Sequence, residues 1–423
     1  MPTPSAARAL APLVHAVLGE SLPVEVRFWD GSRAGATDGP ATIVLRSPNA
    51  LRRILWAPNE VGFARAYITG EADIEGDMLQ AIRVMFQAAP EDLLIGTRTV
   101  VRTLAGALRL GVLGPPLAPP AEEARLRGGR HSRERDAAAI AHHYDVGNDF
   151  YRLVLGESMT YSCARFVQPD ASLEEAQVAK YDLICRKLGL REGMRLLDVG
   201  CGWGGMVMHA AANFGVGAVG ITLSEQQFEL ARKRVAEAGL SEWVEVRLQD
   251  YRDVGGGGER FDAISSIGMF EHVGKDQMAA YFSVLARVLT PRGRLLNHAI
   301  STPNGAAFDR RSFTARYVFP DGELEDVADV VAAMEAVDLE VRDVESLREH
   351  YALTTRKWVS NLERNWDEAV SLVGDVRARI WRLYMAAAVV GFELNQTAVH
   401  QVLGVKTKAD GSSGMPLTRA DMI

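Results

Sequence analysis

The sequence of 423 residues is poor in cysteine, lacks any long apolar run and has no excess of basic charge. Its three cysteines, Cys163, Cys185 and Cys201, do not have metal-ligand spacing. We therefore expect neither a metal site nor a disulfide framework, and a reducing, cytoplasmic compartment. No stretch reaches the ~18 uninterrupted apolar residues of a membrane-spanning helix, so membrane association should be peripheral. The formal net charge of −7 disfavours nucleic acid as a partner.

A chain of this length predicts two domains. Residues 1–120 mix short β-like runs, such as Val24 to Phe28 and Ala41 to Leu45, with turn signals and helical periodicity. This pattern predicts a small α+β accessory domain for lipid, membrane or dimer contact. Prolines followed by clustered arginines predict a basic linker over 121–140, which leaves 141–423 for the larger domain.

Two arginine-rich stretches each permit two interpretations. Apolar residues from Arg98 to Leu113 have helical spacing with arginines on one side, which fits a basic amphipathic helix on lipid or an ordinary surface helix. The arginines of the linker fit either a solvated segment or attraction to phospholipid headgroups, and they are Arg125, Arg127, Arg130, Arg133 and Arg135.

Strands and helical segments alternate after about residue 170, which predicts a doubly wound α/β domain with a parallel sheet covered on both faces. The expected strands are Arg195 to Val199, Val216 to Ile221, Val244 to Leu248, Phe261 to Ser265 and Arg294 to Ala299.

A glycine-rich turn, Gly200 to Gly205, joins the apolar strand Met194 to Val199 to a helical stretch, Met206 to Asn213. This is the arrangement at which α/β sheets bind nucleotides, because glycine lets a ligand approach the backbone closely. Asp198 precedes the turn, where its carboxylate would attract a sulfonium or amino group and repel a pyrophosphate. The turn therefore favours S-adenosylmethionine (SAM) over a dinucleotide.

Polar groups follow the next two predicted strands. Thr222 to Gln227 would reach ribose hydroxyls, although Ser224 also fits as the cap of a following helix. Gln249 to Asp253 would offer adenine a polar edge and an aromatic neighbour, and an ordinary surface loop is the alternative.

Several stretches together resemble one family, the cyclopropane-fatty-acid synthases, which include the mycolic-acid methyltransferases. The resemblance covers roughly residues 135–400 and rests on these segments: His143 to Tyr151, Met159 to Ala164, Gly200 to Gly205, Thr222 to Gln227, Gln249 to Asp253, Ser266 to Gly274, Tyr317 to Gly322, and His350-Tyr351 with Trp358. It implies a SAM-methyltransferase, Rossmann-like catalytic domain over 141–423 with helical insertions around a lipid pocket.

The resemblance also implies the SAM contacts. With Asp198 from the strand pattern, they are Tyr161, Ser162, Gly200, Cys201, Gly202, Thr222, Leu223, Gln227, Gln249 and Tyr251.

In this family the π bond of a cis-unsaturated acyl chain attacks the SAM methyl group, and a bound bicarbonate ion removes a proton from the resulting cation. The groups implied to hold bicarbonate are the backbones of Cys163 and Ile300 and the side chains of Glu271, His298 and Tyr351. Aromatic faces would stabilise the cation. Tyr144, Tyr317 and Phe319 are candidates, and each also fits as a core residue.

The product and the partners stay open at this level. Ala388 stands where some members carry a cysteine proposed as catalytic, which disfavours a thiol nucleophile. The N-terminal segment resembles that of phospholipid-acting members and favours an unsaturated, oleoyl-type phospholipid acyl chain. The tail from Leu403 to Pro416 resembles actinobacterial relatives that make 10-methyl-branched chains, so a methylene or methyl-branched product stands beside a cyclopropane. The sequence does not decide homodimer formation or a reductase partner.

Two other functions are compatible with the sequence patterns. A catalytically inactive lipid-binding or scaffold protein would keep the fold, but it would not need Glu271, His298 and Tyr351. Methylation of an oxygen or nitrogen atom in a small molecule would use the same fold with a polar acceptor.

Overall fold

The computed structural model describes residues 5–10, 24–36, 38–88, 105–124, 128–130, 132–144, 146–306, 308–420 and 422. The chain forms two compact units. The smaller unit comprises Met1–Ala124, Arg311–Val318 and Trp366–Val390, and the larger unit comprises Arg125–Arg310, Phe319–Asn365 and Gly391–Ile423. The smaller unit thus combines the first part of the chain with two segments from its second half. The domain bounds expected from the sequence stay a prediction.

The smaller unit contains a four-stranded sheet in the order β2-β1-β3-β4, in which only β1 and β3 are parallel. Its strands are β1 (Glu25–Arg27), β2 (Arg33–Gly35), β3 (Ala41–Leu45) and β4 (Ala72–Gly76). Its helices are α2 (Pro48–Trp56), α3 (Glu60–Ile68), α4 (Met78–Ala88), α12 (Phe313–Tyr317), α15 (Trp366–Val373) and most of α16 (Asp375–Glu393). Both β-like runs expected here are strands. Arg98 and Arg102 of the predicted basic helix lie outside the described residues.

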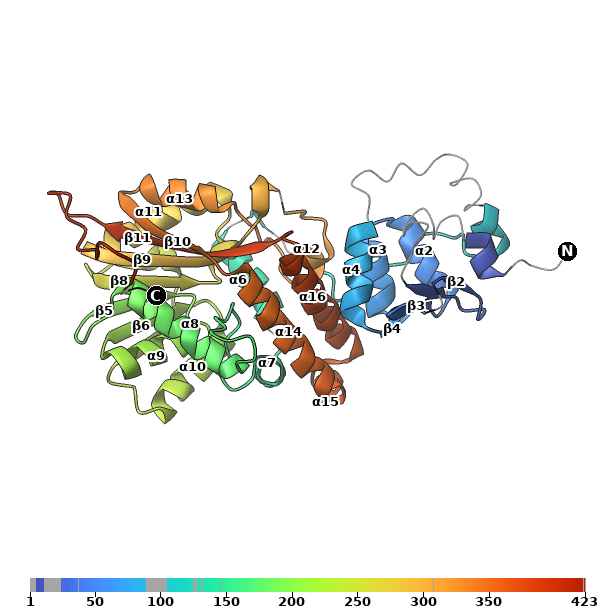
Figure 1. The fold of residues 1–423 in the computed structure, drawn as a ribbon, viewed down its shortest axis with the longest axis horizontal. Coiled ribbons are helices and arrows are strands. Elements are labelled where there is room, and N and C mark those ends of the chain that lie inside the picture. Colours follow the sequence, from blue (N-terminus) through green and yellow to red (C-terminus); the bar gives the residue numbers. More distant parts are fainter. Residues whose placement is uncertain are drawn as a thin grey trace. The chain divides into compact units, whose positions relative to one another are not determined.

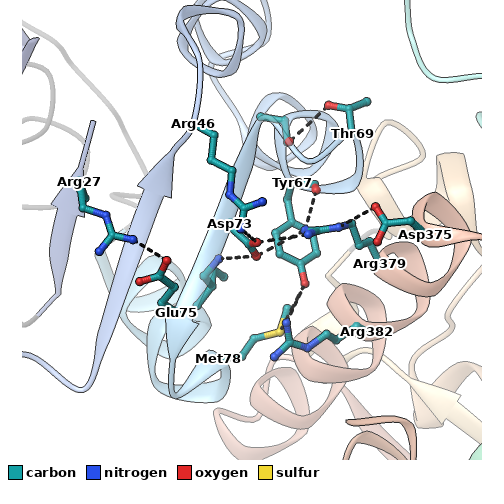
Figure 2. A network of polar contacts seen from close by, with 12 residues as sticks. Arg27, Arg46, Tyr67, Thr69, Asp73, Glu75, Met78, Asp375, Arg379 and Arg382 are labelled. Atoms are coloured by element: carbon teal, nitrogen blue, oxygen red, sulfur yellow. Dashed lines mark hydrogen bonds and ion pairs between the residues drawn. The ribbon is translucent and has the colours of Figure 1, made fainter. Parts of the chain in front are cut away.

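A buried carboxylate connects β4 to α16 within the smaller unit, as Figure 2 shows. Asp73 on β4 is 8% exposed and accepts hydrogen bonds from Arg46 at 2.5 Å and from Arg379 of α16 at 3.2 Å. Burial alone would raise the pKa of Asp73, but the hydrogen bond and charge of Arg379 outweigh it, and this pKa lies below its usual value. Arg382 donates to the Tyr67 hydroxyl at 3.3 Å. Segments far apart in the sequence are therefore joined by charge-assisted bonds.

The larger unit is built on a seven-stranded sheet in the order β10-β11-β9-β8-β5-β6-β7. Its strands are β5 (Arg195–Val199), β6 (Gly217–Thr222), β7 (Val244–Leu248), β8 (Phe261–Ile267), β9 (Leu289–Ser301), β10 (Leu339–Ser346) and β11 (Ala398–Lys406). The five strands expected from the sequence pair in parallel, which confirms the doubly wound class. β11 inserts antiparallel between β9 and β10, so the complete sheet is mixed.

Helices cover both faces of this sheet, and Figure 1 shows α11 and α13 along one face and α9 and α10 along the other. Alternate residues of each strand supply the two cores, as Leu196 and Leu197 of β5 illustrate. The helices are α6 (Arg133–Tyr144), α7 (Asn148–Leu155), α8 (Leu173–Leu188), α9 (Gly205–Phe214), α10 (Glu225–Glu237), α11 (Met278–Val288), α13 (Val327–Glu335) and α14 (Arg348–Arg364). Short 3₁₀ helices are η1 (Tyr251–Asp253), η2 (Phe270–His272), η3 (Lys275–Gln277) and η4 (Pro303–Gly305).

Three arginines of the predicted linker bind carboxylates of the larger unit, and Arg125 and Arg127 lie outside the described residues. Arg133 pairs with Asp253 at 2.8 Å, Arg130 with Glu323 at 2.6 Å, and Arg135 also contacts an aspartate. α6 begins at Arg133, inside the stretch expected to be a linker. These pairs favour an internal role for the arginines over attraction to phospholipid headgroups.

We expect Asp73→Ala to lower the free energy of unfolding by about 3 kcal/mol, because it leaves the largely buried guanidinium of Arg379 with only the more exposed carboxylate of Asp375. Denaturant unfolding followed by circular dichroism measures the change. Glu75→Ala is the matched control, since its ion pair with Arg27 is half exposed and should contribute under about 1 kcal/mol. Equal losses in the two variants would contradict a special role for Asp73.

Candidate functional site

A cavity in the larger unit lies at the carboxyl ends of β5, β6 and β8. β5 is the switch point of the sheet, because the chain proceeds from it to β6 on one side and later to β8 on the other. The cavity is lined by every residue predicted to contact SAM, namely Tyr161, Ser162, Asp198, Gly200, Cys201, Gly202, Thr222, Leu223, Gln227, Gln249 and Tyr251.

The glycine turn that follows β5 requires glycine at its first position. Gly200 has φ +79°, and a Cβ there would lie 2.7 Å from the Cβ of Met269. The backbone N–H groups of Gly200 and Cys201 both donate to the Ile221 carbonyl, at 3.0 and 2.9 Å. The turn is thereby fixed to β6, and its open side faces the cavity.

Asp198 lies at the end of β5 with 2% exposure, and it accepts a hydrogen bond from the Ser265 hydroxyl at 2.6 Å. Burial raises the pKa of Asp198 to about 6, against the opposing effects of Ser265 and Lys180. The group is therefore mostly ionised at neutral pH, and its negative charge is available to a cationic ligand.

The polar residues after β6 and β7 bind one another. The Thr222 hydroxyl donates to the Gln227 side-chain oxygen at 2.8 Å, and the Gln249 N–H donates to the Thr222 carbonyl at 3.0 Å. Ser224 caps α10 by accepting from the Gln227 N–H at 3.3 Å, so the capping interpretation is confirmed. These bonds hold the carboxyl ends of both strands in place around the cavity.

Glu271, on η2, belongs to a second set of predicted residues and contacts one of them, Ile300, directly. Its Oε1 accepts from the Ile300 N–H at 2.7 Å. His298 and Ile300 lie on the same face of β9, since side chains alternate along a strand. Within the described part of the chain, Oε2 of Glu271 and Nε2 of His298 are buried without a hydrogen-bond partner. Such groups are costly unless a ligand satisfies them.

Burial sets the protonation of this group. It raises the pKa of Glu271 to about 7, against the opposing hydrogen bond from Ile300, and it lowers the pKa of His298 to about 3. His298 is therefore neutral, and its Nδ1 lies 3.2 Å from Nε2 of Gln401. Burial also raises the pKa of the Cys163 thiol far above neutrality, so this residue does not supply a thiolate.

Aromatic rings connect the cavity to Tyr351. The ring centroids of Tyr161 and Trp358 are 5.1 Å apart, and those of Trp358 and Tyr351 are 6.0 Å apart. Phe319 joins the same series through His143. The ring centroid of His143 lies 4.1 Å from that of Phe319 and 5.3 Å from that of Tyr161. These faces are suited to stabilising positive charge on a ligand.

Two of the predicted aromatic candidates, Tyr317 and Tyr144, are not seen in this series of rings. Tyr317 belongs to the smaller unit, where its hydroxyl donates to Glu123 at 2.8 Å and its ring lies 5.4 Å from Phe313. The side chain of Tyr144 lies outside the described residues.

The sequence interpretation missed several residues of the cavity wall. Lys180, Asp136, Trp203, Arg252 and His272 all line it. Arg252 pairs with Asp136 at 2.8 Å. Trp203, Arg252 and His272 belong to segments already singled out, and no local pattern distinguishes Lys180 and Asp136 from ordinary helix residues.

Comparisons with known proteins agree with this geometry. The pattern of the family described as mycolic acid cyclopropane synthetase matches residues 131–402. The chain belongs to this family. It is 44% identical over 408 residues to a probable fatty acid methyltransferase of Mycobacterium tuberculosis, covering 93% of this chain and 94% of the relative. It is 32% identical to the tuberculostearic acid methyltransferase UfaA1 of the same organism, covering 95% and 92%.

A solved structure of the mycolic acid cyclopropane synthase CmaA1, complexed with S-adenosylhomocysteine (SAH) and CTAB, is also similar. It is 34% identical, with a TM-score of 0.60 over 63% of this chain and 97% of that one. Family and fold together make this protein a SAM-dependent methyltransferase. The two curated relatives extend over nearly the whole chain, whereas the solved structure matches a shorter part of it.

We expect Gly200→Ala to weaken SAH binding by at least about tenfold, because an alanine must adopt an unfavourable positive φ and displace Met269. Isothermal titration calorimetry measures the change. Gly217→Ala is the control, since nothing lies within 4 Å of the added Cβ at the start of β6. Unchanged SAH affinity in Gly200→Ala would contradict the placement of the ligand at this turn.

Proposed function

We propose that this protein transfers the methyl group of SAM to the cis double bond of an unsaturated phospholipid acyl chain of the oleoyl type. The observation that carries the proposal is that Oε2 of Glu271 and Nε2 of His298 are buried without a hydrogen-bond partner among the described residues, and that Glu271 precedes His272, which lines the cavity with the features of a SAM site. The names of the relatives support a fatty acyl substrate.

The residues around Glu271 fit a small oxyanion such as bicarbonate. Neutral His298 donates through one ring nitrogen, and Tyr351 offers a hydroxyl donor. Glu271 in its ionised form accepts the hydroxyl proton of the anion and so orients it. Bound SAM would supply the methyl group, and bound bicarbonate would supply the base that removes a proton from the alkylated chain.

The remaining residues orient the chain and protect the cation. Asp198 and the glycine turn would hold the donor, while Tyr161, which lines the cavity and is backed by the stacked ring of Trp358, would lie near the positive charge that develops on the acyl chain. Proton loss from the added methyl carbon closes a cyclopropane. A hydride shift before proton loss gives a methylene branch, which a reductase partner would convert to a methyl branch.

We expect Glu271→Gln to retain SAH affinity and to lose about 10²- to 10⁴-fold in turnover, because an amide whose oxygen keeps the bond from the Ile300 N–H presents a donor where the carboxylate would accept from the anion. Since burial raises the pKa of Glu271 to about 7, its carboxylate becomes populated as the pH rises through neutrality. Wild-type kcat should therefore increase between about pH 6 and 8, and kcat of the variant should not show this increase. SAH release with oleoyl phospholipid is the readout, and unchanged turnover would remove Glu271 from the mechanism.

Lipid analysis tests the reaction and its competitors. Expression in an oleate-containing host followed by mass-spectrometric fragmentation distinguishes a cyclopropane from its isomeric methylene chain. Purified protein that forms no SAH with unsaturated lipid would favour the inactive scaffold. Turnover only with a polar small molecule would favour methylation of oxygen or nitrogen.

We also propose peripheral contact with an anionic membrane through the smaller unit. No helix among the described residues is long and apolar enough to cross a membrane. Trp56, Leu108 and Leu113 are 59%, 68% and 43% exposed, and the Trp56 indole donates to the carbonyl of Gly114, next to Leu113. Arg52, which contacts the Pro115 carbonyl, has no carboxylate partner in the described part of the chain. An exposed tryptophan beside a cation is typical of a lipid interface.

Trp56→Ala combined with Leu108→Ser should reduce co-sedimentation with vesicles containing anionic phospholipid by about tenfold, with a smaller effect at high salt. Trp243→Ala is the control, because Trp243 is 48% exposed but belongs to the larger unit. Equal vesicle binding by all three proteins would contradict this surface. The measurement needs no turnover, so it is independent of the proposed reaction.

A further inference from the structure

Two lysines of α8 are fully buried, but their surroundings differ. Lys187 has carboxylates beside it, with Asp343 at 2.8 Å and Glu345 at 2.5 Å from its Nζ. Lys180 is 0% exposed, and within the described residues no carboxylate lies within ion-pair distance of its Nζ. The groups that Nζ contacts are the Ser162 hydroxyl at 3.1 Å and the face of the Tyr181 ring, whose centroid is 3.9 Å away.

A buried ammonium group without a carboxylate is unfavourable, since water no longer solvates its charge. Burial accordingly lowers the pKa of Lys180 to about 7, and the acidic groups of Cys163 and Asp198 offset the effect only in part. Retaining a lysine at this position therefore suggests that an anion reaches it in some state of the protein.

The cavity supplies the route for that anion. Lys180 lines it beside Ser162 and Asp198. The Asp198 carboxylate accepts a hydrogen bond from the Ser265 hydroxyl and forms no ion pair with Lys180. The counter-ion must then come from the ligand. SAM carries a sulfonium and an amino group that suit Asp198, and one carboxylate that suits a lysine.

We propose that Lys180 is the counter-ion of the amino-acid carboxylate of SAM, with Ser162 holding the ammonium group in position. This inference rests on the placement of SAM in the cavity and not on the identity of the acyl substrate. Opposite charges at Asp198 and Lys180 would fix the direction of the methionyl portion and so aim the methyl group. The role is one of binding and positioning, and Lys180 takes no part in proton transfer.

The test compares ligands that differ only in the carboxylate. SAH and its decarboxylated analogue are titrated calorimetrically into wild-type protein and into Lys180→Met, which keeps the length of the side chain. We expect the variant to bind SAH about 10- to 100-fold more weakly and the decarboxylated analogue within about threefold of wild type. The preference for the carboxylate should therefore disappear.

Controls separate this role from a structural one. Lys233→Met removes an exposed lysine of α10 and should change neither affinity. Thermal unfolding of Lys180→Met should show no loss of stability, because a buried charge has been replaced by an apolar chain of similar size. Lys180→Gln provides a second variant if methionine perturbs packing. Equal weakening of both ligands, or unchanged SAH affinity in both variants, would overturn the proposal. Neither measurement requires methyl transfer, so a failed acyl substrate would not affect it.

Discussion

The parallel pairing of β5 with β6 and β8 determines where the polar groups of the site emerge. Parallel strands bring their carboxyl ends to one edge, and the change of direction at β5 opens that edge to a ligand. Asp198, Thr222 and Ser265 are all strand residues whose positions follow from the register. Side chains on strands are held more rigidly than side chains on loops, so the sheet would orient the proposed methyl donor before any substrate arrives.

The two groups of functional residues depend on this sheet in different ways. The cofactor cavity uses the ends of several strands, whereas the group around Glu271 uses a single face of β9 together with η2. β11 pairs with β9 along its length, with Gln401 opposite His298. The antiparallel insertion therefore supports the histidine from the side, and Gln401 contacts its second ring nitrogen. The mixed part of the sheet thus supports a residue of the proposed bicarbonate site.

Much of this arrangement could be predicted from the sequence. The strand Arg195 to Val199 and its glycine turn follow from local patterns, because apolar strand residues and positive-φ glycines are specified within a few positions. Lys180 could not be found in this way, since its burial and its lack of a carboxylate partner depend on tertiary packing. β10 and β11 were missed for a related reason: their pairing joins segments that are distant in the sequence. Tyr317 was selected from a local motif, but its position in the fold depends on a contact with Glu123, which is distant in the sequence.

The hydrogen bond between Glu271 and the Ile300 N–H has a consequence for the resting protein. One carboxylate oxygen already occupies the amide, so the proposed anion could use this N–H only by sharing it with Glu271. The buried Nε2 of His298, which has no hydrogen-bond partner among the described residues, would then be the ring donor that a bound anion gains outright. An anion held by so few uncommitted donors should exchange readily, and its concentration would then influence the rate of the proposed reaction.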